Sequence, residues 1–485
     1  MHIESTEQSC SETLANFVAK LRYEDIPAAV AAKARTHILD SIGNALAGST
    51  MEWARNGSSV FRKLAGPPEA TVIGHAGRIA AANAAIANGI GIAALDYDDT
   101  DYGGGGNHMS RHVVATALAA GEAANCTGKD LITAVVIGYE VAPRVGASLM
   151  VDRYGVRAAR ATWGAEELAA HHRMHHEGGM LVRAYVPGLY SSALIAGRLF
   201  GLNAQQLTSA QGLVGGLGLF LGQSHREGAD AHVHAAWAAH SGIIAASWAR
   251  DGLRGPRLIY EGDRGLLAVI GKDLHDATRL TSGLGTEWTT LKNVLKFYPA
   301  GHGPHHFMEA LKSLVIEYKL RPQDVLQIDC RAPAQRIEFH FEPKETKLHP
   351  TPYNARFSLP YLLARLLADG ELGPLSFTAD KVTEPAVLEL ASRVTYTADE
   401  ASWFGEQRGE VTVKLRDGRS LVRSAPELLG FPSRPCTRED VVSKFRANAK
   451  LIHENPKRTD ELLAALESLE KIKNIRDIMN LATPG

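Results

Sequence analysis

The chain has 485 residues, which is room for two or three domains, and 45% of them are hydrophobic against 22% charged. Lysine and arginine number 52 and aspartate and glutamate 53, so the formal net charge of −1 argues against bulk electrostatic binding to nucleic acid or to an anionic membrane. The four cysteines form no C-x-x-C pair, which argues against a disulfide framework and fits a reducing cytoplasm. The sequence shows neither a secretory signal nor an uninterrupted apolar span, so we expect a cytoplasmic protein that does not enter membranes.

Helical patterns dominate the first part of the chain. Ser9 and Glu12 have the S-x-x-E spacing of a capping box ahead of a helix. Pro27 suits the first turn of a second helix, whose apolar residues recur at helical spacing until Gly48. Residues 79–95 are mostly alanine and glycine with hardly a charge, so we expect this helix in the middle of a bundle.

The hydrophobic period changes after about residue 290, where alternation replaces helical spacing. Residues 337–341 alternate apolar and polar side chains, as a half-buried strand does. Residues 411–415 alternate in the same way before Asp417-Gly418, a dipeptide typical of hairpin turns. A helical and highly charged pattern returns at Thr437. We therefore predict a mainly α protein with a large all-helical domain, an inserted smaller α+β lid domain and a C-terminal helical return. The predicted boundaries are 1–286 for the first helical part, 287–430 for the lid domain and 431–485 for the return.

The densest polar segment of the N-terminal half, residues 95–112, directly follows the apolar helix. It carries four aspartates, Thr100 and two histidines around a run of four glycines. Buried carboxylates must be paired or functional, and glycines let the backbone approach a ligand. Aspartate and histidine side chains here can act as general acid and base, or the segment is a solvated acidic loop. A third interpretation is a metal site, with two histidines four apart on a predicted helix. Its ligands would be Asp96, Asp98, Asp99, His108 and His112.

Two further segments are rich in histidine. Residues 169–179 hold two i,i+4 histidine pairs, His171/His175 and His172/His176, which favour a solvated histidine face over a metal site because no H-E-x-x-H pattern or cysteine accompanies them. Residues 225–240 carry four histidines among small residues, a pattern more typical of packing residues than of catalysts.

Lys296 lies among apolar and aromatic neighbours, where burial lowers the pKa of a lysine or directs its charge toward an anionic substrate. Prolines and glycines mark a rigid loop after it, and His305 opens the next predicted helix, whose N-terminal dipole favours anions. A lone lysine beside an aromatic ring is usually a surface residue. Lys296 is nevertheless a candidate site residue, because it lies at the junction of the helical and mixed regions, where binding clefts form.

Several of these segments, taken in order, resemble the MmgE/PrpD family. The likeness covers nearly the whole chain and runs through ANAAIANGIGIAALDYDDT, HMS, GYEV, HAAWAAHSG, LKFYPAGHGPHH and ARFSLPY. The family includes 2-methylcitrate dehydratase, cis-aconitate decarboxylase and iminodisuccinate epimerase. The resemblance implies a helical domain with an α+β lid domain, homodimers, and chemistry without a metal or an organic cofactor.

The resemblance also implies site residues. It makes Asp96, His108 and Lys296 the catalytic residues, and Thr100, His305 and His234 the substrate-binding ones. The matched motifs are D-[FY]-D-D-T for Asp96 and Thr100, H-P-S for His108, K-x-Y-P for Lys296 with His305 following, and K-R-x-H for His234.

The chain departs from the family pattern at several positions. Met109 replaces the proline of H-P-S, and Ala231 stands where many members have an anion-binding lysine. The G-[FW]-H-P-T segment has no clear match, and residues 169–179 look like an insertion that can supply a replacement histidine. These changes indicate a substrate that is less anionic than methylcitrate.

We therefore expect a cofactor-independent lyase of the 2-methylcitrate dehydratase type, which removes a proton next to a carboxylate of a small polycarboxylate. Epimerisation or decarboxylation of a related substrate is the alternative, because both also develop charge at a carbon next to a carboxylate. A metal-dependent hydrolase and a catalytically degenerate family member are the remaining hypotheses. The expected partners are a small carboxylate substrate and a second copy of the chain, with no nucleic acid and no membrane.

Overall fold

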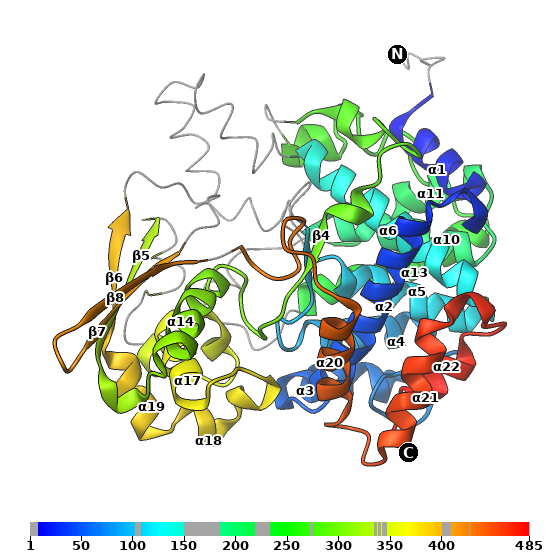
Figure 1. The fold of residues 1–485 in the computed structure, drawn as a ribbon. Coiled ribbons are helices and arrows are strands. Elements are labelled where there is room, and N and C mark those ends of the chain that lie inside the picture. Colours follow the sequence, from blue (N-terminus) through cyan, green and yellow to red (C-terminus); the bar gives the residue numbers. More distant parts are fainter. Residues whose placement is uncertain are drawn as a thin grey trace. The chain divides into compact units, whose positions relative to one another are not determined.

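The computed structural model describes most of the chain. The described residues are 8–101, 108–149, 185–218, 233–271, 275–333, 337, 341, 347–399, 409–425 and 427–484. The protein is mainly α, as the sequence predicts (Figure 1). The chain divides into two units, which we call the helical unit and the sheet unit. The helical unit comprises Met1–Ala94, Asp98–Val294 and Arg438–Gly485, and the sheet unit comprises Leu95–Tyr97 and Leu295–Thr437.

Helices build almost all of the described helical unit. They are α1 (Cys10–Lys20), α2 (Ala28–Gly48), α3 (Glu52–Leu64), α4 (Ala81–Ala93), α5 (Ser110–Ala124), α6 (Gly128–Leu149), α10 (Pro187–Leu199), α11 (Ala204–Val214), α13 (Val233–Arg250), α20 (Arg438–Ala449), α21 (Pro456–Glu467) and α22 (Arg476–Leu481). Short strands accompany them as two pairs: β1 (Ala70–Thr71) with β2 (Arg78–Ile79), and β3 (Asp99–Asp101) with β4 (Asn293–Leu295).

The first helices begin and end for the reasons that the sequence indicates. Ser9 and Glu12 form the predicted capping box of α1, with each side chain bonded to the other residue's backbone N–H. Pro27 is the N-cap of α2, one position before the helix, and α2 ends at Gly48. A Cβ atom on Gly48 would overlap the carbonyl oxygen of Gly91 on α4, so glycine is required where these two helices cross.

Helix α4 lies at the centre of the helical unit, as its composition predicts. Every residue of α4 except Asn83 is buried, and the helix packs against α2, α3, α5 and α13 (Figure 1). Small side chains make this possible because they allow neighbouring helices to approach closely on all sides.

Helices α5, α10 and α13 run in the same direction through the unit. Two successive levels of contact between these helices are four residues apart on each helix, and the residue numbers increase in the same direction on all three. This pattern requires the helices to be parallel. The first level of contacts joins His112, Gly188 and Ala238, and the second joins Thr116, Ser192 and Gly242. The N-terminal ends of the three helices therefore lie together at one end of the unit.

Helix α20 packs against α2 and brings residues from the end of the chain to its beginning. The ammonium of Lys444 lies 2.7 Å from an oxygen of Asp40, and both side chains are buried. The amide of Asn448 donates to Asn44 one turn further along α2 at 3.1 Å. This buried polar seam fixes the register of the two helices.

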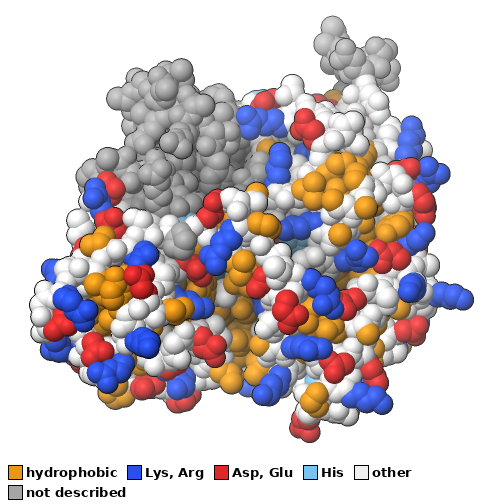
Figure 2. Space-filling view, in the orientation of Figure 1, with side chains coloured by type: hydrophobic (Ala, Val, Ile, Leu, Met, Phe, Trp, Pro, Cys, Tyr) orange, Lys and Arg blue, Asp and Glu red, His pale blue; other side chains and the backbone are white. Residues whose placement is uncertain are grey.

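Helix α6 is the one described helix that is long and apolar enough to cross a membrane by length and composition. The protein buries 94% of its most apolar window, so α6 serves as a core helix. Figure 2 shows basic and acidic side chains interspersed over the described part of the visible face, as the near-zero net charge leads one to expect.

The sheet unit is a four-stranded sheet with helices. Its strand order is β6-β5-β7-β8, with β5 and β6 parallel and the other neighbours antiparallel. Helix α14 packs on β7 and β8, and α17 packs on β6. The elements are β5 (Val325–Pro333), β6 (Val394–Asp399), β7 (Glu410–Leu415), β8 (Ser420–Ser424), α14 (His305–Tyr318), α17 (Leu359–Asp369), α18 (Ala379–Val382) and α19 (Pro385–Ser392).

The structure confirms one predicted strand pair and contradicts one predicted strand. Strands β7 and β8 form the predicted hairpin, and Gly418 supplies the positive φ of +90° that its turn requires. By contrast, the backbone N–H of Phe341 donates to the carbonyl of Ile337 at 2.8 Å, which is a helical bond. Both side chains are buried, and their spacing of four satisfies a helix as well as a strand. Residues 338–340 lie outside the described part of the chain.

Candidate functional site

A buried arginine pairs with the second aspartate of the polar segment. Arg111, in the first turn of α5, donates from Nε and Nη2 to the two carboxylate oxygens of Asp98, at 2.7 and 2.8 Å. Both side chains are fully buried. Such a bidentate pair fixes the position of the carboxylate as well as neutralising it. The sequence reasoning did not identify Arg111, although an arginine within an otherwise apolar helix was a usable signal.

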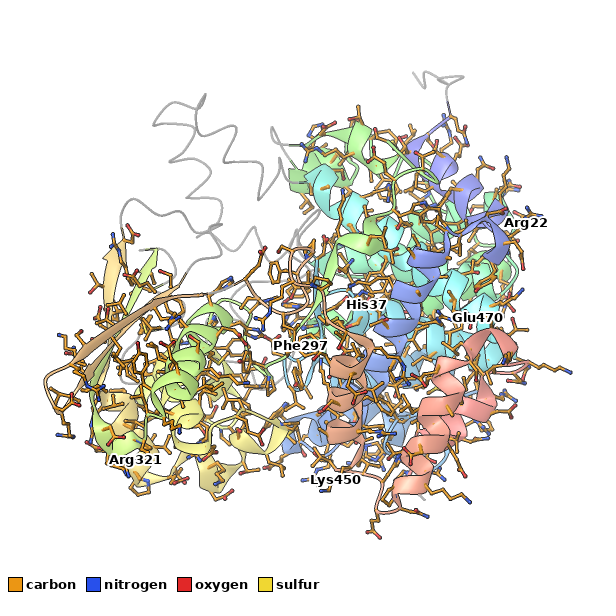
Figure 3. All side chains as sticks on the ribbon, viewed as in Figure 1. Arg22, His37, Phe297, Arg321, Lys450 and Glu470 are labelled. Atoms are coloured by element: carbon orange, nitrogen blue, oxygen red, sulfur yellow. The ribbon has the colours of Figure 1, made fainter. Side chains whose placement is uncertain are left out.

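Asp99 caps the same helix through its side chain. The backbone N–H of Ser110 donates to one carboxylate oxygen at 3.0 Å, and the hydroxyl of Tyr139 on α6 donates to the other at 2.7 Å. The ring of His37 stacks on Tyr139 with 4.6 Å between centroids, and its Nδ1 lies 3.7 Å from the carboxylate. Figure 3 labels His37 on α2. Asp99 is therefore held by neutral hydrogen-bond donors, whereas Asp98 is held by the cationic side chain of Arg111.

The pKa of Asp99 reflects its burial without a cationic partner. Burial raises the pKa of Asp99 to about 6, the Asp98 carboxylate acts in the same direction, and the bonds from Ser110 and Tyr139 oppose them. Burial also lowers the pKa of His37 well below its usual range, so the imidazole beside Asp99 is neutral. Asp99 consequently titrates closer to neutrality than an ordinary aspartate does.

His108 is held by the backbone of the segment that carries Asp99. Its Nδ1 lies 2.6 Å from the carbonyl oxygen of Asp99 and 3.3 Å from the hydroxyl of Thr100. A carbonyl only accepts hydrogen bonds, so Nδ1 carries the proton and the lone pair of the neutral ring is on Nε2. His108 precedes α5, which begins at Ser110, so the prediction that His108 and His112 share a helix is wrong. Met109 lies between His108 and the helix as its N-cap.

Two other histidines lie at the N-terminal end of the three parallel helices. His112 is buried between α5 and α10, where burial lowers its pKa to about 3 and the charge of Arg111 acts in the same direction. His234, in the first turn of α13, meets the ring of Tyr185 edge to face at 4.8 Å. The structure thus places His234 at the same end of the helical unit as His112.

The sheet unit contains the predicted lysine. The Lys296 ammonium lies 2.9 Å from the carbonyl oxygen of Asp96 and 3.1 Å from its carboxylate. Lys296 is 0% exposed and Asp96 3% exposed, so this is a buried ion pair and not a surface lysine. Tyr97, the next residue, donates from its hydroxyl to the carbonyl of Phe297 at 3.4 Å (Phe297 is labelled in Figure 3). The segment Leu95–Tyr97 is thereby fixed beside residues 296–297, which directly follow β4.

Asp96 has an unusual backbone. Its φ of +48° lies in the left-handed region, which costs a non-glycine residue about 1–2 kcal/mol and which aspartate tolerates better than most. In this conformation one residue presents both its carbonyl and its carboxylate to the same ammonium. Strain of this kind persists where the surrounding structure imposes it, often at functional sites.

The loop after Lys296 carries the remaining predicted residue. His305 opens α14, as predicted, and its Nε2 lies 3.2 Å from the carbonyl oxygen of Ala300. The rings of Tyr298 and His302 lie against His305, at centroid distances of 5.3 and 4.7 Å. The backbone N–H of Gly301 donates to the carbonyl of Arg356 at 3.0 Å.

Arg356 is a residue that the sequence reasoning did not assign to the site. Its side chain is fully buried, its guanidinium lies 4.3 Å from the centroid of the Tyr353 ring, and its Nε donates to the Tyr353 carbonyl at 3.1 Å. The segment ARFSLPY entered only as a point of resemblance, because arginine in a loop gives no local sign of burial. Its backbone carbonyl, and not its side chain, accepts the bond from Gly301 in the loop after Lys296.

Other expectations concern residues that the structure does not describe. The run of four glycines, the insertion with His171–His176, and the positions of Ala231 and His232 all lie outside the described residues. The predictions about them stay predictions.

The three aspartates bear on the alternative chemistries. Asp96 pairs with Lys296, Asp98 pairs with Arg111, and Asp99 accepts from Ser110 and Tyr139. Each carboxylate therefore has a protein donor, with which a metal ion at this segment would have to compete.

Comparison with known proteins decides the family. Residues 12–277 match the MmgE/PrpD N-terminal domain, and residues 298–468 match the MmgE/PrpD C-terminal domain. The chain belongs to the MmgE/PrpD family. The N-terminal match includes Asp96, Thr100, His108 and His234, whereas Lys296 falls between the two matched ranges.

Curated MmgE/PrpD relatives are similar over almost their full length. The cis-aconitate decarboxylase-like protein oryM of Aspergillus oryzae is 25% identical, with 98% of this chain and 97% of the relative covered. The cis-aconitate decarboxylase of Aspergillus terreus is 24% identical with the same coverage. The human cis-aconitate decarboxylase is 26% identical, with 97% of this chain and 92% of the relative covered.

Proposed function

We propose that this protein is a cofactor-independent lyase that decarboxylates a small polycarboxylate of the cis-aconitate type. The observation that carries the proposal is the fixed ring of His108, whose Nδ1 proton is held by the Asp99 carbonyl. A histidine with a defined tautomer is the usual device for moving a proton to or from carbon. The full-length similarity to cis-aconitate decarboxylases favours decarboxylation over the dehydration expected from the sequence.

His108 manages the proton in this proposal. When the bond between a substrate carbon and its carboxylate breaks, carbon dioxide leaves and the electron pair passes into the adjoining carbon framework. One proton must then reach carbon. Nε2 of His108 first takes up a proton from solvent and then delivers it to carbon, which returns the ring to its neutral form. Thr100, which also contacts Nδ1 of His108, keeps the ring in place and orients the substrate.

Lys296 holds negative charge in this proposal. Its ammonium is desolvated, so its attraction for a carboxylate is much stronger than that of a surface lysine. Asp96 keeps this charge compensated until substrate binds. His305, in the first turn of α14, is the second residue of this unit that binds substrate oxygens in the proposal.

The experiment that tests the reaction incubates the purified protein in D₂O with cis-aconitate, 2-methylcitrate, citrate or iminodisuccinate and follows each by proton NMR. We expect cis-aconitate to lose a carboxylate and its product to carry deuterium. New alkene signals from 2-methylcitrate or citrate would establish the dehydratase instead. Deuteration without net loss would establish an epimerase, and no change with any compound would contradict an enzymatic role on these substrates.

The experiment that tests the residue replaces His108. His108→Ala should lower kcat for cis-aconitate by about 10²–10⁴-fold, because a positioned acid–base group contributes that much. Circular dichroism should show an unchanged fold. His453→Phe is a matched control, since His453 is also buried in the helical unit but bonds to Thr459 in the C-terminal segment. Full activity of His108→Ala would contradict the assigned role.

A further inference from the structure

The end of the helical unit where α5, α10 and α13 begin contains a buried histidine that the proposed mechanism does not use. His112 is 1% exposed. Within the part of the chain that the structure describes, neither ring nitrogen of His112 has a hydrogen-bond partner. Nearly all buried polar groups in proteins are hydrogen-bonded, so such a side chain requires an explanation.

The packing around His112 shows which part of the ring is used. A Cβ atom on Gly188 would lie 3.1 Å from both Cγ and Cδ2 of His112, and 3.1 Å from the side chain of Ala238. The carbon side of the ring thus packs against the first turn of α10, and the nitrogens take no part in this contact. An apolar ring would fill the same space and would not bury unpaired nitrogens, so packing alone does not account for a histidine here.

The surroundings of His112 favour an anionic ligand. The N-terminal ends of parallel helices carry partial positive charge that adds up at one place. Asp99 caps α5, but Val186, the N-cap of α10, makes no side-chain cap bond to the first turn of its helix. Tyr185 and His234 lie at this end of α10 and α13.

We propose that His112 contacts the substrate, and that it donates a ring N–H to a carboxylate oxygen at the shared N-terminal end of α5, α10 and α13. The inference rests on the proposed function for the class of the substrate, a polycarboxylate. His112 is neutral, because burial lowers its pKa to about 3, so it recognises the carboxylate as a dipolar donor and not as a cation. The site would then combine the helix ends with one uncharged donor.

The test compares His112→Phe with the wild-type protein and uses tricarballylate, a saturated tricarboxylate that has no double bond, as the probe. Isothermal titration calorimetry measures its Kd, and thermal unfolding measures Tm. We expect His112→Phe to keep or raise the Tm of the unliganded protein, because it removes unpaired buried nitrogens. We also expect it to weaken tricarballylate binding at least tenfold and to lower kcat/KM for cis-aconitate at least a hundredfold. His453→Phe, which changes another buried histidine, should leave tricarballylate binding unchanged.

Several outcomes would overturn the inference. Tricarballylate binding to His112→Phe within twofold of wild type would show that His112 is a packing residue. No binding of tricarballylate to the wild-type protein would reject a tricarboxylate site at this end of the three helices. If His112→Phe does not fold, ¹⁵N NMR of the wild-type histidines replaces it, and an unchanged His112 signal on addition of tricarballylate would overturn the inference. Wild-type protein that binds tricarballylate through His112 but releases no carbon dioxide from cis-aconitate would leave the inference standing and reject the proposed function.

Discussion

Asp96 and Asp98 are separated by one residue, yet they pair with different cations in different units. Asp98 receives two hydrogen bonds from the fork of Arg111 in the helical unit. Asp96 contacts the single ammonium of Lys296 in the sheet unit and shares it with its own carbonyl oxygen. A bidentate arginine pair fixes geometry, whereas lysine is a point charge that can exchange one carboxylate for another. The comparison indicates that the first pair positions the chain, whereas the second leaves the ammonium able to change partners, as the proposed function requires.

The largest expected effect is on turnover, through Lys296. Lys296→Ala should lower kcat/KM for cis-aconitate by about 10³-fold, because removal of a group that stabilises developing charge typically has this effect. The variant also leaves the Asp96 carboxylate buried without its counter-charge, which lowers stability. The double variant Lys296→Ala/Asp96→Asn removes both charges and should recover stability but not turnover. Wild-type turnover in either variant would remove Lys296 from the site.

The second prediction concerns stability, through Arg111. Arg111→Ala should lower the free energy of unfolding by about 3–5 kcal/mol, because it strands a buried carboxylate. Urea unfolding followed by circular dichroism measures it. Arg22→Ala, which breaks the exposed pair with Asp25, is the control and should give no measurable change. A loss for Arg111→Ala no larger than that of the control would refute the view that the Asp98 pair is a structural anchor.

The third prediction is a pH dependence that distinguishes Asp99 from its neighbour. The folded-state pKa of Asp99 is raised to about 6, above its unfolded value, so the folded protein binds this proton more tightly than the unfolded chain does. The contribution of Asp99 to stability is therefore fully present below about pH 4 and is lost as the pH rises through about 6, a total of about 3 kcal/mol. The difference in unfolding free energy between wild type and Asp99→Asn, measured at pH 4, 5, 6 and 7, should decline over this range. A constant difference would show that Asp99 has an ordinary pKa.

The smallest expected effect is that of Tyr139. Tyr139→Phe should lower the free energy of unfolding by about 1–2 kcal/mol through the loss of one buried hydrogen bond. Because this bond lowers the pKa of Asp99, its removal should also move the pH dependence of stability to higher pH. Tyr260→Phe removes a comparable buried bond, to Gln211, and should lower stability without moving that pH dependence. Equal pH dependence in the two variants would contradict the link between Tyr139 and Asp99.

Local signals in the sequence predicted the local elements well. The capping box of Ser9 and Glu12 and the hairpin at Asp417-Gly418 both occur where their patterns indicate, because each is determined by residues a few positions apart. The prediction of a strand at Ile337 and Phe341 was wrong. Apolar residues at every second position also recur at every fourth, so a buried strand and a buried helix both fit the pattern.

The partners of the polar residues could not be predicted in the same way. The sequence identified Asp98, Asp99 and Lys296 as candidate site residues. Their partners, however, lie on helices or segments that are distant in the sequence. Arg111 is 13 positions from Asp98, Tyr139 is 40 from Asp99, and Asp96 is 200 from Lys296. Only the packing of α5 and α6 and the path of Leu95–Tyr97 bring these atoms together, and no spacing rule spans such separations.

The buried seam between α2 and α20 has a consequence for how the protein is made. It joins Asn44 to Asn448 across 404 positions, and it neutralises Asp40 with Lys444. During translation Asp40 leaves the ribosome long before Lys444 exists, and enclosing its carboxylate in a helical core without that counter-charge is unfavourable. Strands β5 to β8 are complete before α20 is synthesised. We therefore expect the helical unit to close around α2 only after α20 has been synthesised.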